Sequence, residues 1–265
     1  MPIGQRVGGG DGADQRLIIT PEEFDRTVAG LSIESCSLVI AMDFTKSNNQ
    51  GPTPLHFSPV VAGDFLAQPY MAALRAVGNS LNRDSLDDDK SYPAYAFGND
   101  TSKSTGLTAF RAPDAAGREQ ECRGLTGVET SVLLRYLRLV RTISDASIEY
   151  DKAAGNKVVL AGGTSFAPAI YRACEHIREQ EGCYHILLII TDGVPGTPED
   201  REETRAAIAF ASRSFPLSIL IVGVGPGEVG KGFSEMKVLD DACDGGRDIV
   251  RGLALTHRLA APIFS

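Results

Sequence analysis

Apolar and polar positions along this chain form blocks that predict strands and helices in alternation. Continuous apolar runs, as at 37–42 and 217–222, are typical of strands buried on both faces. The predicted strands are 37–42, 92–97, 185–191, 217–222 and 247–250. Helical spacing of apolar residues, or strong apolar character over a longer stretch, predicts the helices 69–81, 128–143, 167–180 and 199–213.

This alternation indicates a mostly parallel central sheet between two layers of helices, an α/β fold. No internal repeat and no second hydrophobic unit is visible, so we expect one domain at 20–254. The Gly-rich start predicts a flexible tail at 1–19, and 255–265 is expected to be a second tail. Thr20, Pro21 and Glu23 have the pattern of a helix start, and 99–125 is expected to be a long surface loop.

Composition narrows the class of protein. The formal net charge of −8 argues against a nucleic-acid partner, because such proteins need a basic face. The 5 cysteines are widely and irregularly spaced, with no Cys-x-x-Cys pair, which favours a reduced intracellular protein in the cytoplasm or the nucleus. No apolar run approaches the ~20 residues of a transmembrane helix, and the polar start predicts no secretory signal.

Oxygen-bearing side chains collect where predicted strands end. Asp43, Thr45 and Ser47 directly follow the first strand, and Asp192 follows another. Thr164 stands after two glycines at the start of a predicted helix. Ligands in open α/β sheets collect beyond the carboxyl ends of strands, and Mg²⁺ favours an all-oxygen set of this kind. Taken singly, Asp43 could be a turn residue and Thr164 a helix cap.

In this order, the motifs resemble the metal-ion-dependent adhesion site of von Willebrand factor A domains. The sequence of these motifs is most similar to that of copines and of copine-like RING ubiquitin ligases, over about 21–250. The matching stretches are 42–48, 95–98, 163–168, 184–193 and 216–225. The resemblance implies a three-layer, Rossmann-like von Willebrand A fold. It also implies that Thr45, Ser47 and Thr164 bind a cation directly, with Asp43 and Asp192 acting through water.

The function that the resemblance implies is binding, not catalysis. Hydroxyl ligands leave Mg²⁺ or Mn²⁺ electrophilic, so a protein partner's Asp or Glu carboxylate is a suitable final ligand. An alternative from another class is a component that recruits substrates or partners in a ubiquitin ligase system. We expect no RING and no paired C2 domains in this chain, so any membrane association would be indirect.

Other motifs compete with this interpretation. The segment 225–232 has the spacing G-x-G-x-x-G and nearly that of a phosphate-binding loop, yet Gly232 stands where Ser or Thr should be. An esterase using Ser165 with His185 or His257 lacks the usual Gly-x-Ser-x-Gly turn. His185, within an apolar strand, is expected to be a packed histidine, and His56 a structural one. The acidic positions 87–89 and 240–241 are expected to be surface turns.

Overall fold

The strands and helices follow the predicted alternation. The computed structural model describes residues 36–49, 55–56, 69–81, 90–99, 105–125, 131–144, 160, 162–180, 183–225, 239, 242 and 246–255. The strands are β1 (Ser37–Asp43), β2 (Ser91–Tyr92), β3 (Ala94–Phe97), β4 (Thr108–Ala109), β5 (Cys122–Arg123), β6 (His185–Thr191), β7 (Leu217–Val224) and β8 (Val250–Leu255). The helices are η1 (Lys46–Asn49), α2 (Pro69–Leu81), α3 (Val132–Ser144), α4 (Ala167–Glu179) and α5 (Pro198–Ser214).

Six strands form the central sheet, in the order β4-β3-β1-β6-β7-β8. All neighbours pair in parallel except β3 and β4, which are antiparallel. Strand β1 therefore lies between β3 and β6. From this point later strands are added on both sides of β1, β3 and β4 on one side and β6, β7 and β8 on the other. Ligands of open α/β sheets bind beyond the carboxyl end of such a strand.

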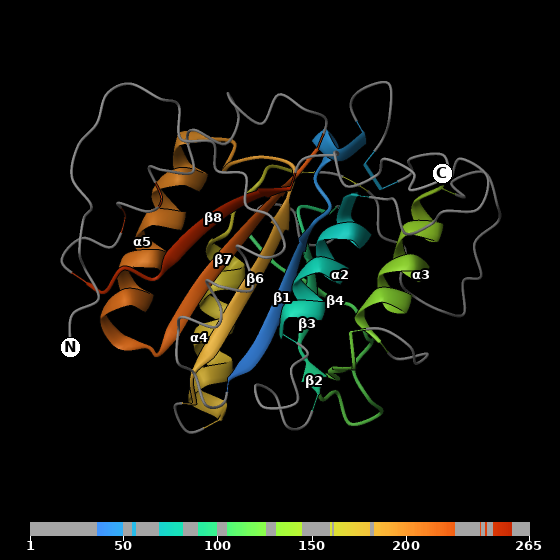
Figure 1. Ribbon diagram of the computed structural model, residues 1–265, viewed down its shortest axis with the longest axis horizontal. Helices are drawn as coiled ribbons and strands as arrows, with labels where there is room; N and C mark the ends of the chain where they lie inside the picture. Colours follow the sequence, from blue (N-terminus) through green and yellow to red (C-terminus); the bar gives the residue numbers. More distant parts are fainter. Residues whose placement is uncertain are drawn as a thin grey trace, which may run out of the picture.

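Two hydrophobic layers cover the sheet, and β1 contributes alternate residues to each. Leu38, Ile40 and Met42 pack in the layer that contains residues of α2 and α3. Val39 and Ala41 pack in the layer that contains residues of α4 and α5. Figure 1 shows these helix pairs on opposite sides of the strands. The continuous apolar run of β1 thus reflects burial on both faces, and the predicted three-layer α/β fold is confirmed.

Several predicted boundaries were wrong where pairing with a distant strand decides the structure. The loop expected at 99–125 contains β4 and β5, which pair with β3 and β2 respectively. The last strand is Val250–Leu255 and not 247–250, because it pairs along β7. The strand expected at 92–97 is divided at Pro93, which has no backbone N–H to donate. Helix α3 begins at Val132, later than expected.

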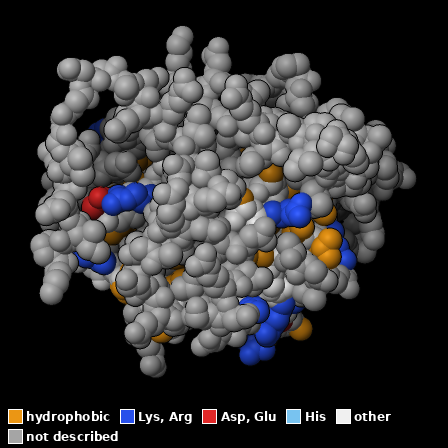
Figure 2. All heavy atoms as spheres, viewed as in Figure 1, with side chains coloured by type: hydrophobic (Ala, Val, Ile, Leu, Met, Phe, Trp, Pro, Cys, Tyr) orange, Lys and Arg blue, Asp and Glu red, His pale blue; other side chains and the backbone are white. Residues whose placement is uncertain are grey.

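The tail expected at 1–19 and the helix start at 20–23 lie outside the described residues. Of the tail expected at 255–265, the first residue, Leu255, is the end of β8, and the rest lies outside the described residues. Among the helices that the structure describes, none is long and apolar enough to cross a bilayer. On the face in Figure 2, the visible Lys and Arg side chains form separate groups.

His185 at the start of β6 is a packed histidine, as predicted. Its side chain is buried, and its Nδ1 lies 2.8 Å from the Cys183 carbonyl oxygen, to which an Nδ1–H donates. Burial disfavours the charged ring and lowers the pKa of His185 below its ordinary value. The unfolded chain therefore binds more protons than the folded protein on acidification, and the folded state loses stability as pH falls below the unfolded pKa.

We accordingly expect His185→Gln to have a shallower loss of stability on acidification than the parent protein. The amide of Gln can still donate a hydrogen bond but has no proton to gain. Denaturant unfolding at about pH 7 and about pH 5, on either side of the free imidazole pKa of ~6.5, measures the difference. Equal pH dependence in the two proteins would contradict this prediction.

Candidate metal centre

The carboxyl ends of β1 and β6 bring two acidic residues from distant parts of the chain together. These strands are parallel neighbours, with Met42 opposite Ile190, so Asp43 lies beside Thr191 at the same edge of the sheet. The Thr191 hydroxyl donates to Asp43 Oδ2 at 2.5 Å. Asp192, the next residue, begins the loop that leads to α5. The predicted convergence of strand ends therefore holds for both aspartates.

The turn after β1 joins these aspartates through two hydroxyls. The Thr45 backbone N–H donates to Asp43 Oδ1 at 2.8 Å, which bends the chain back over the strand end. The hydroxyls of Thr45 and Ser47 lie 2.9 Å apart, and Ser47 donates to Asp192 Oδ1 at 3.1 Å. Four predicted residues thus form one hydrogen-bonded group, the strand-end cluster of Asp43, Thr45, Ser47 and Asp192.

Thr164, the fifth predicted residue, lies in the turn before α4. Its backbone carbonyl accepts a hydrogen bond from Gly196 N at 3.0 Å, which ties this turn to the loop that carries Asp192. The N-cap of α4 is Phe166, so the alternative of Thr164 as the helix cap is wrong. Thr164 is buried, and among the described residues no hydrogen bond joins its hydroxyl to the strand-end cluster. The structure ties its backbone, not its hydroxyl, to the Asp192 loop.

Electrostatics make the cluster unfavourable for two bare carboxylates. Burial raises the pKa of Asp43, against hydrogen bonds from Thr191 and Thr45 that favour its charged form. Burial also raises the pKa of Asp192, and the negative charge of Asp43 raises it further. A cation would offset both charges. Among the described residues there is no group of three or more His, Cys, Asp or Glu suited to a metal, so the cluster is distinguished by its hydroxyls.

Asn48 is a site residue that the sequence analysis missed. Its amide nitrogen lies 3.2 Å from Asp43 Oδ1 and 3.4 Å from Thr45 Oγ1, and its amide oxygen accepts a hydrogen bond of 2.6 Å from the Tyr70 hydroxyl. Asn48 is buried, unlike its neighbour Ser47. Its position directly after Asp-x-Thr-x-Ser was the available signal. The contact with Tyr70 of α2 required the folded structure.

His56 is buried and holds the backbone of Asp43 by a hydrogen bond. Burial lowers the pKa of His56 to about 3, so its ring is neutral near pH 7. Its Nε2 lies 2.9 Å from the Asp43 carbonyl oxygen, which can only accept, so Nε2 carries the proton. Its Nδ1 therefore accepts from the Tyr136 hydroxyl of α3, at 2.9 Å. The structural role predicted for His56 is confirmed, and its partner Tyr136 was missed.

Most of the competing motifs fall outside the described residues. These are the loop residues 226–232, the acidic positions 87–89 and 240–241, and His257. Among the described residues no hydrogen bond joins Ser165 to His185, which lies at the start of β6, whereas the turn that holds Ser165 is bonded to the loop after the end of β6. Ser165 is buried, and its hydroxyl has no hydrogen-bond partner among the residues that the structure describes.

Comparison with known proteins places these features in a family. Residues 63–253 match the model of the copine family. The E3 ubiquitin-protein ligase RGLG5 of Arabidopsis thaliana is 32% identical over 244 residues, which are 85% of this chain and 48% of that protein. Copine family protein 2 of Caenorhabditis elegans is 31% identical over 210 residues, 78% of this chain and 2% of that protein. The chain thus spans half or less of these relatives.

Solved structures with a similar arrangement include von Willebrand A domains. A von Willebrand factor type A protein from Catenulispora acidiphila has 17% identity and a TM-score of 0.45, over 84% of this chain and 39% of that one. The manganese-loaded TRAP protein of Plasmodium vivax has 13% identity and a TM-score of 0.42, over 86% of this chain and 70% of that one. It is the sequence match along most of the chain that assigns the family. This protein is a member of the copine family.

Proposed function

We propose that this domain binds Mg²⁺ or Mn²⁺ at the strand-end cluster together with Thr164, and through it a carboxylate of a protein partner. The observation that carries the proposal is the continuous hydrogen-bonded path from Asp43 through Thr45 and Ser47 to Asp192. It gathers hydroxyl and carboxylate oxygens, the ligands that hard divalent cations prefer. The domain acts by binding and catalyses no reaction.

In this proposal the hydroxyl residues and the aspartates have different roles. Thr45, Ser47 and Thr164 hold the cation through hydroxyl oxygens, and Asp43 and Asp192 accept hydrogen bonds from its water ligands. Because the direct ligands are neutral, the bound cation supplies a strongly electrophilic centre for an acidic side chain. Asp43 is fixed by Thr191, Asn48 and His56 and needs little rearrangement on binding. Ser47 is exposed at the surface, where a partner can reach it.

Addition of Mg²⁺ is expected to raise the melting temperature, and EDTA to reverse the increase. A ligand that binds only the folded state at 100 times its Kd stabilises it by about 2.7 kcal/mol. Thermal unfolding with Mg²⁺, Ca²⁺ or EDTA measures the effect, and calorimetry gives the affinity. Asp192→Ala should lose the Mg²⁺ response. The exposed residue Glu202 of α5 provides a control, Glu202→Gln, which should retain it. No Mg²⁺ response in the parent protein would refute the metal site.

The partner is tested by affinity capture from the native cell with Mg²⁺ or with EDTA, repeated with Asp192→Ala. Partners that are lost under both conditions are candidates for the carboxylate donor, and replacement of their acidic residues by amides should prevent capture. Partners that bind equally well in EDTA would refute the proposed role of the metal in recognition.

A second candidate function is recruitment within a ubiquitin ligase system, favoured by the relative named as an E3 ubiquitin-protein ligase. In this version the same surface selects a substrate or an adaptor. The chain alone is expected to give no product in a ubiquitination assay with E1 and E2 enzymes. Formation of ubiquitin chains without an added ligase would overturn the non-enzymatic assignment.

A further inference from the structure

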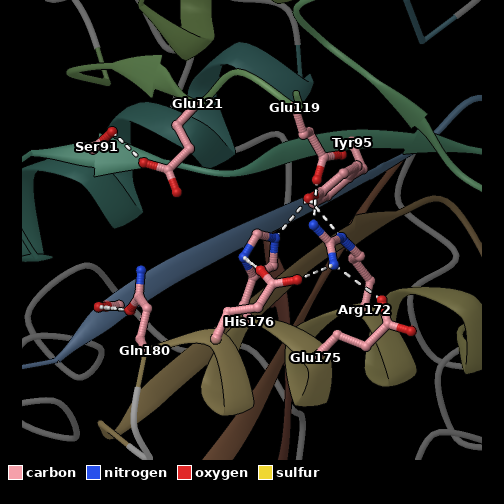
Figure 3. Close-up of polar contacts among 10 residues, drawn as sticks. Ser91, Tyr95, Glu119, Glu121, Arg172, Glu175, His176 and Gln180 are labelled. Atoms are coloured by element: carbon pink, nitrogen blue, oxygen red, sulfur yellow. Dashed lines mark hydrogen bonds and ion pairs between the residues drawn. The ribbon is translucent and has the colours of Figure 1, made fainter. Parts of the chain in front are cut away.

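A polar pocket lies at the other end of β3 from the strand-end cluster. Its volume is about 430 Å³, within the range of roughly 300–1,000 Å³ common for ligand sites. Residues 93–95 at the start of β3 contribute to its lining, α4 forms one wall, and the segment 119–121 forms the other. Figure 3 shows the side chains of Glu119 and Glu121 extending toward α4.

A hydrogen-bonded group fixes one side of this pocket. The Tyr95 hydroxyl lies 2.7 Å from His176 Nε2 and accepts a hydrogen bond of 3.1 Å from Arg172 Nε. His176 Nδ1 faces Glu179 Oε2 at 3.4 Å. Burial lowers the pKa of His176, which keeps the ring neutral near pH 7. The Tyr95 hydroxyl then donates to Nε2, and the His176 proton lies on Nδ1 toward Glu179.

Arg172 is already engaged by the protein and leaves little for an anionic ligand. Its Nε bonds Tyr95, one terminal nitrogen contacts Glu175 and Glu179 at 3.0 and 3.3 Å, and the other contacts Glu119. These contacts involve all three guanidinium nitrogens. The described lining of the pocket therefore offers no cation that lacks a partner, and an anion would have to displace an existing ion pair.

Carboxylates outnumber cations in the pocket. Among the described residues its lining contains Glu119, Glu121 and Glu179 but only one cationic group, Arg172. Arg111 and Arg123 lie with Glu119 and Glu121 around an adjoining pocket. One oxygen of Glu121 accepts from Ser91, and its segment is held from behind by Arg111, which donates to the Glu121 backbone carbonyl. Glu121 and Glu179 thus stand on opposite walls with negative charge in excess. A planar guanidinium, with five donors in a fork, can reach acceptors on two walls at once.

We propose that the pocket between α4 and 119–121 is a docking site for an arginine side chain of a protein partner. The carboxylates on both walls and the occupied state of Arg172 favour a cation, and the presence of acceptors on two walls favours a guanidinium, whose five N–H donors form a fork. The site is independent of the strand-end cluster, because the two lie at opposite ends of β3. A partner that uses both sites would present an acidic residue to one and an arginine to the other.

The proposal is tested by NMR titration of the full ¹⁵N-labelled chain with arginine capped at both ends (acetyl and methylamide). Shifts are expected in the amides of 93–95, 119–121 and 176–180, and they should persist in EDTA. Capped citrulline, the neutral isostere, should cause none, and capped lysine should bind more weakly. Added salt should weaken the interaction. Free arginine, which carries its own carboxylate, should bind more weakly than the capped form.

Two variants on opposite walls, Glu121→Gln and Glu179→Gln, should each weaken capped arginine several-fold. The exposed Glu202 of α5 again supplies the matched control, because Glu202→Gln removes a carboxylate away from the pocket. Absence of shifts up to the solubility limit, equal binding of citrulline, or shifts confined to the strand-end cluster would overturn the proposal. Tighter binding of free arginine would also overturn it, in favour of a small-molecule site.

Discussion

The substitution Asp43→Asn is expected to weaken Mg²⁺ binding by about 10–100-fold while making the metal-free protein more stable. Asp43 is completely buried, and burial raises its pKa because the interior disfavours the charge. Removal of that charge relieves a cost of the folded state and also its repulsion with Asp192. The proposed site loses a charge that offsets the cation. Binding and stability should therefore change in opposite directions.

The hydrogen bonds around residue 43 can survive this replacement. An Asn oxygen can still accept from the Thr45 N–H, as Asp43 Oδ1 does. The new amide group takes the place of Oδ2, which now accepts from Thr191. The Thr191 hydroxyl already lies 2.9 Å from the Gly193 carbonyl oxygen, so it can donate there and accept from the amide. The Thr191 hydroxyl and one N–H of the new amide therefore keep hydrogen-bond partners.

Calorimetry with Mg²⁺ and thermal unfolding in EDTA measure the two effects. A gain of about 1 kcal/mol corresponds to an increase of about 2–4 °C in Tm for a domain of this size. Asp114→Asn is the control, since Asp114 lies at the surface, partly exposed, and hydrogen bonds from Arg118 lower its pKa. It should leave Mg²⁺ binding unchanged and should not raise the Tm. If Asp43→Asn retained full affinity, the assignment of Asp43 to the site would be wrong.

The second large effect is expected for Gly98→Ala, at the end of β3. Gly98 has φ +74°, and an added Cβ would lie 2.2 Å from Thr45 Cγ2. The left-handed backbone costs a residue with a Cβ ~1–2 kcal/mol, and forced overpacking adds about 1–3 kcal/mol. We expect a loss of about 2–5 kcal/mol in the free energy of unfolding. The clash also displaces Thr45, so Mg²⁺ affinity should fall.

Two controls separate backbone strain from the clash. Gly117 has φ +76° but open space around an added Cβ, so Gly117→Ala should show the strain alone. Thr45→Ser removes the Cγ2 methyl group, so the double variant Gly98→Ala, Thr45→Ser should recover part of the lost stability. Denaturant unfolding of the parent protein, the single variants Gly98→Ala and Thr45→Ser and the double variant gives the coupling energy between positions 98 and 45. A coupling energy near zero would show that the Gly98–Thr45 approach is not tight in solution.

Local sequence patterns identified most residues of the candidate site but not the residues that hold them in place. Asp43, Thr45, Ser47 and Asp192 were identifiable because two buried parallel strands end at one edge of a sheet, whatever the helices do. Asn48 and Tyr70 were not, because an Asn in a turn and a Tyr at helical spacing have many uses. Their roles depend on a contact across 22 positions of sequence.

The sequence by itself determined the strands β1, β6 and β7, since short continuous apolar runs rich in Ile, Leu and Val suit a strand covered on both faces. It also determined the oxygen-rich chemistry at their ends. Only the tertiary structure decided the two-residue strands β4 and β5, whose order comes from their partners. The same holds for the neutral state of His56 and the pocket around Tyr95 and Arg172. Burial and charge balance arise where distant segments meet, and no local pattern encodes them.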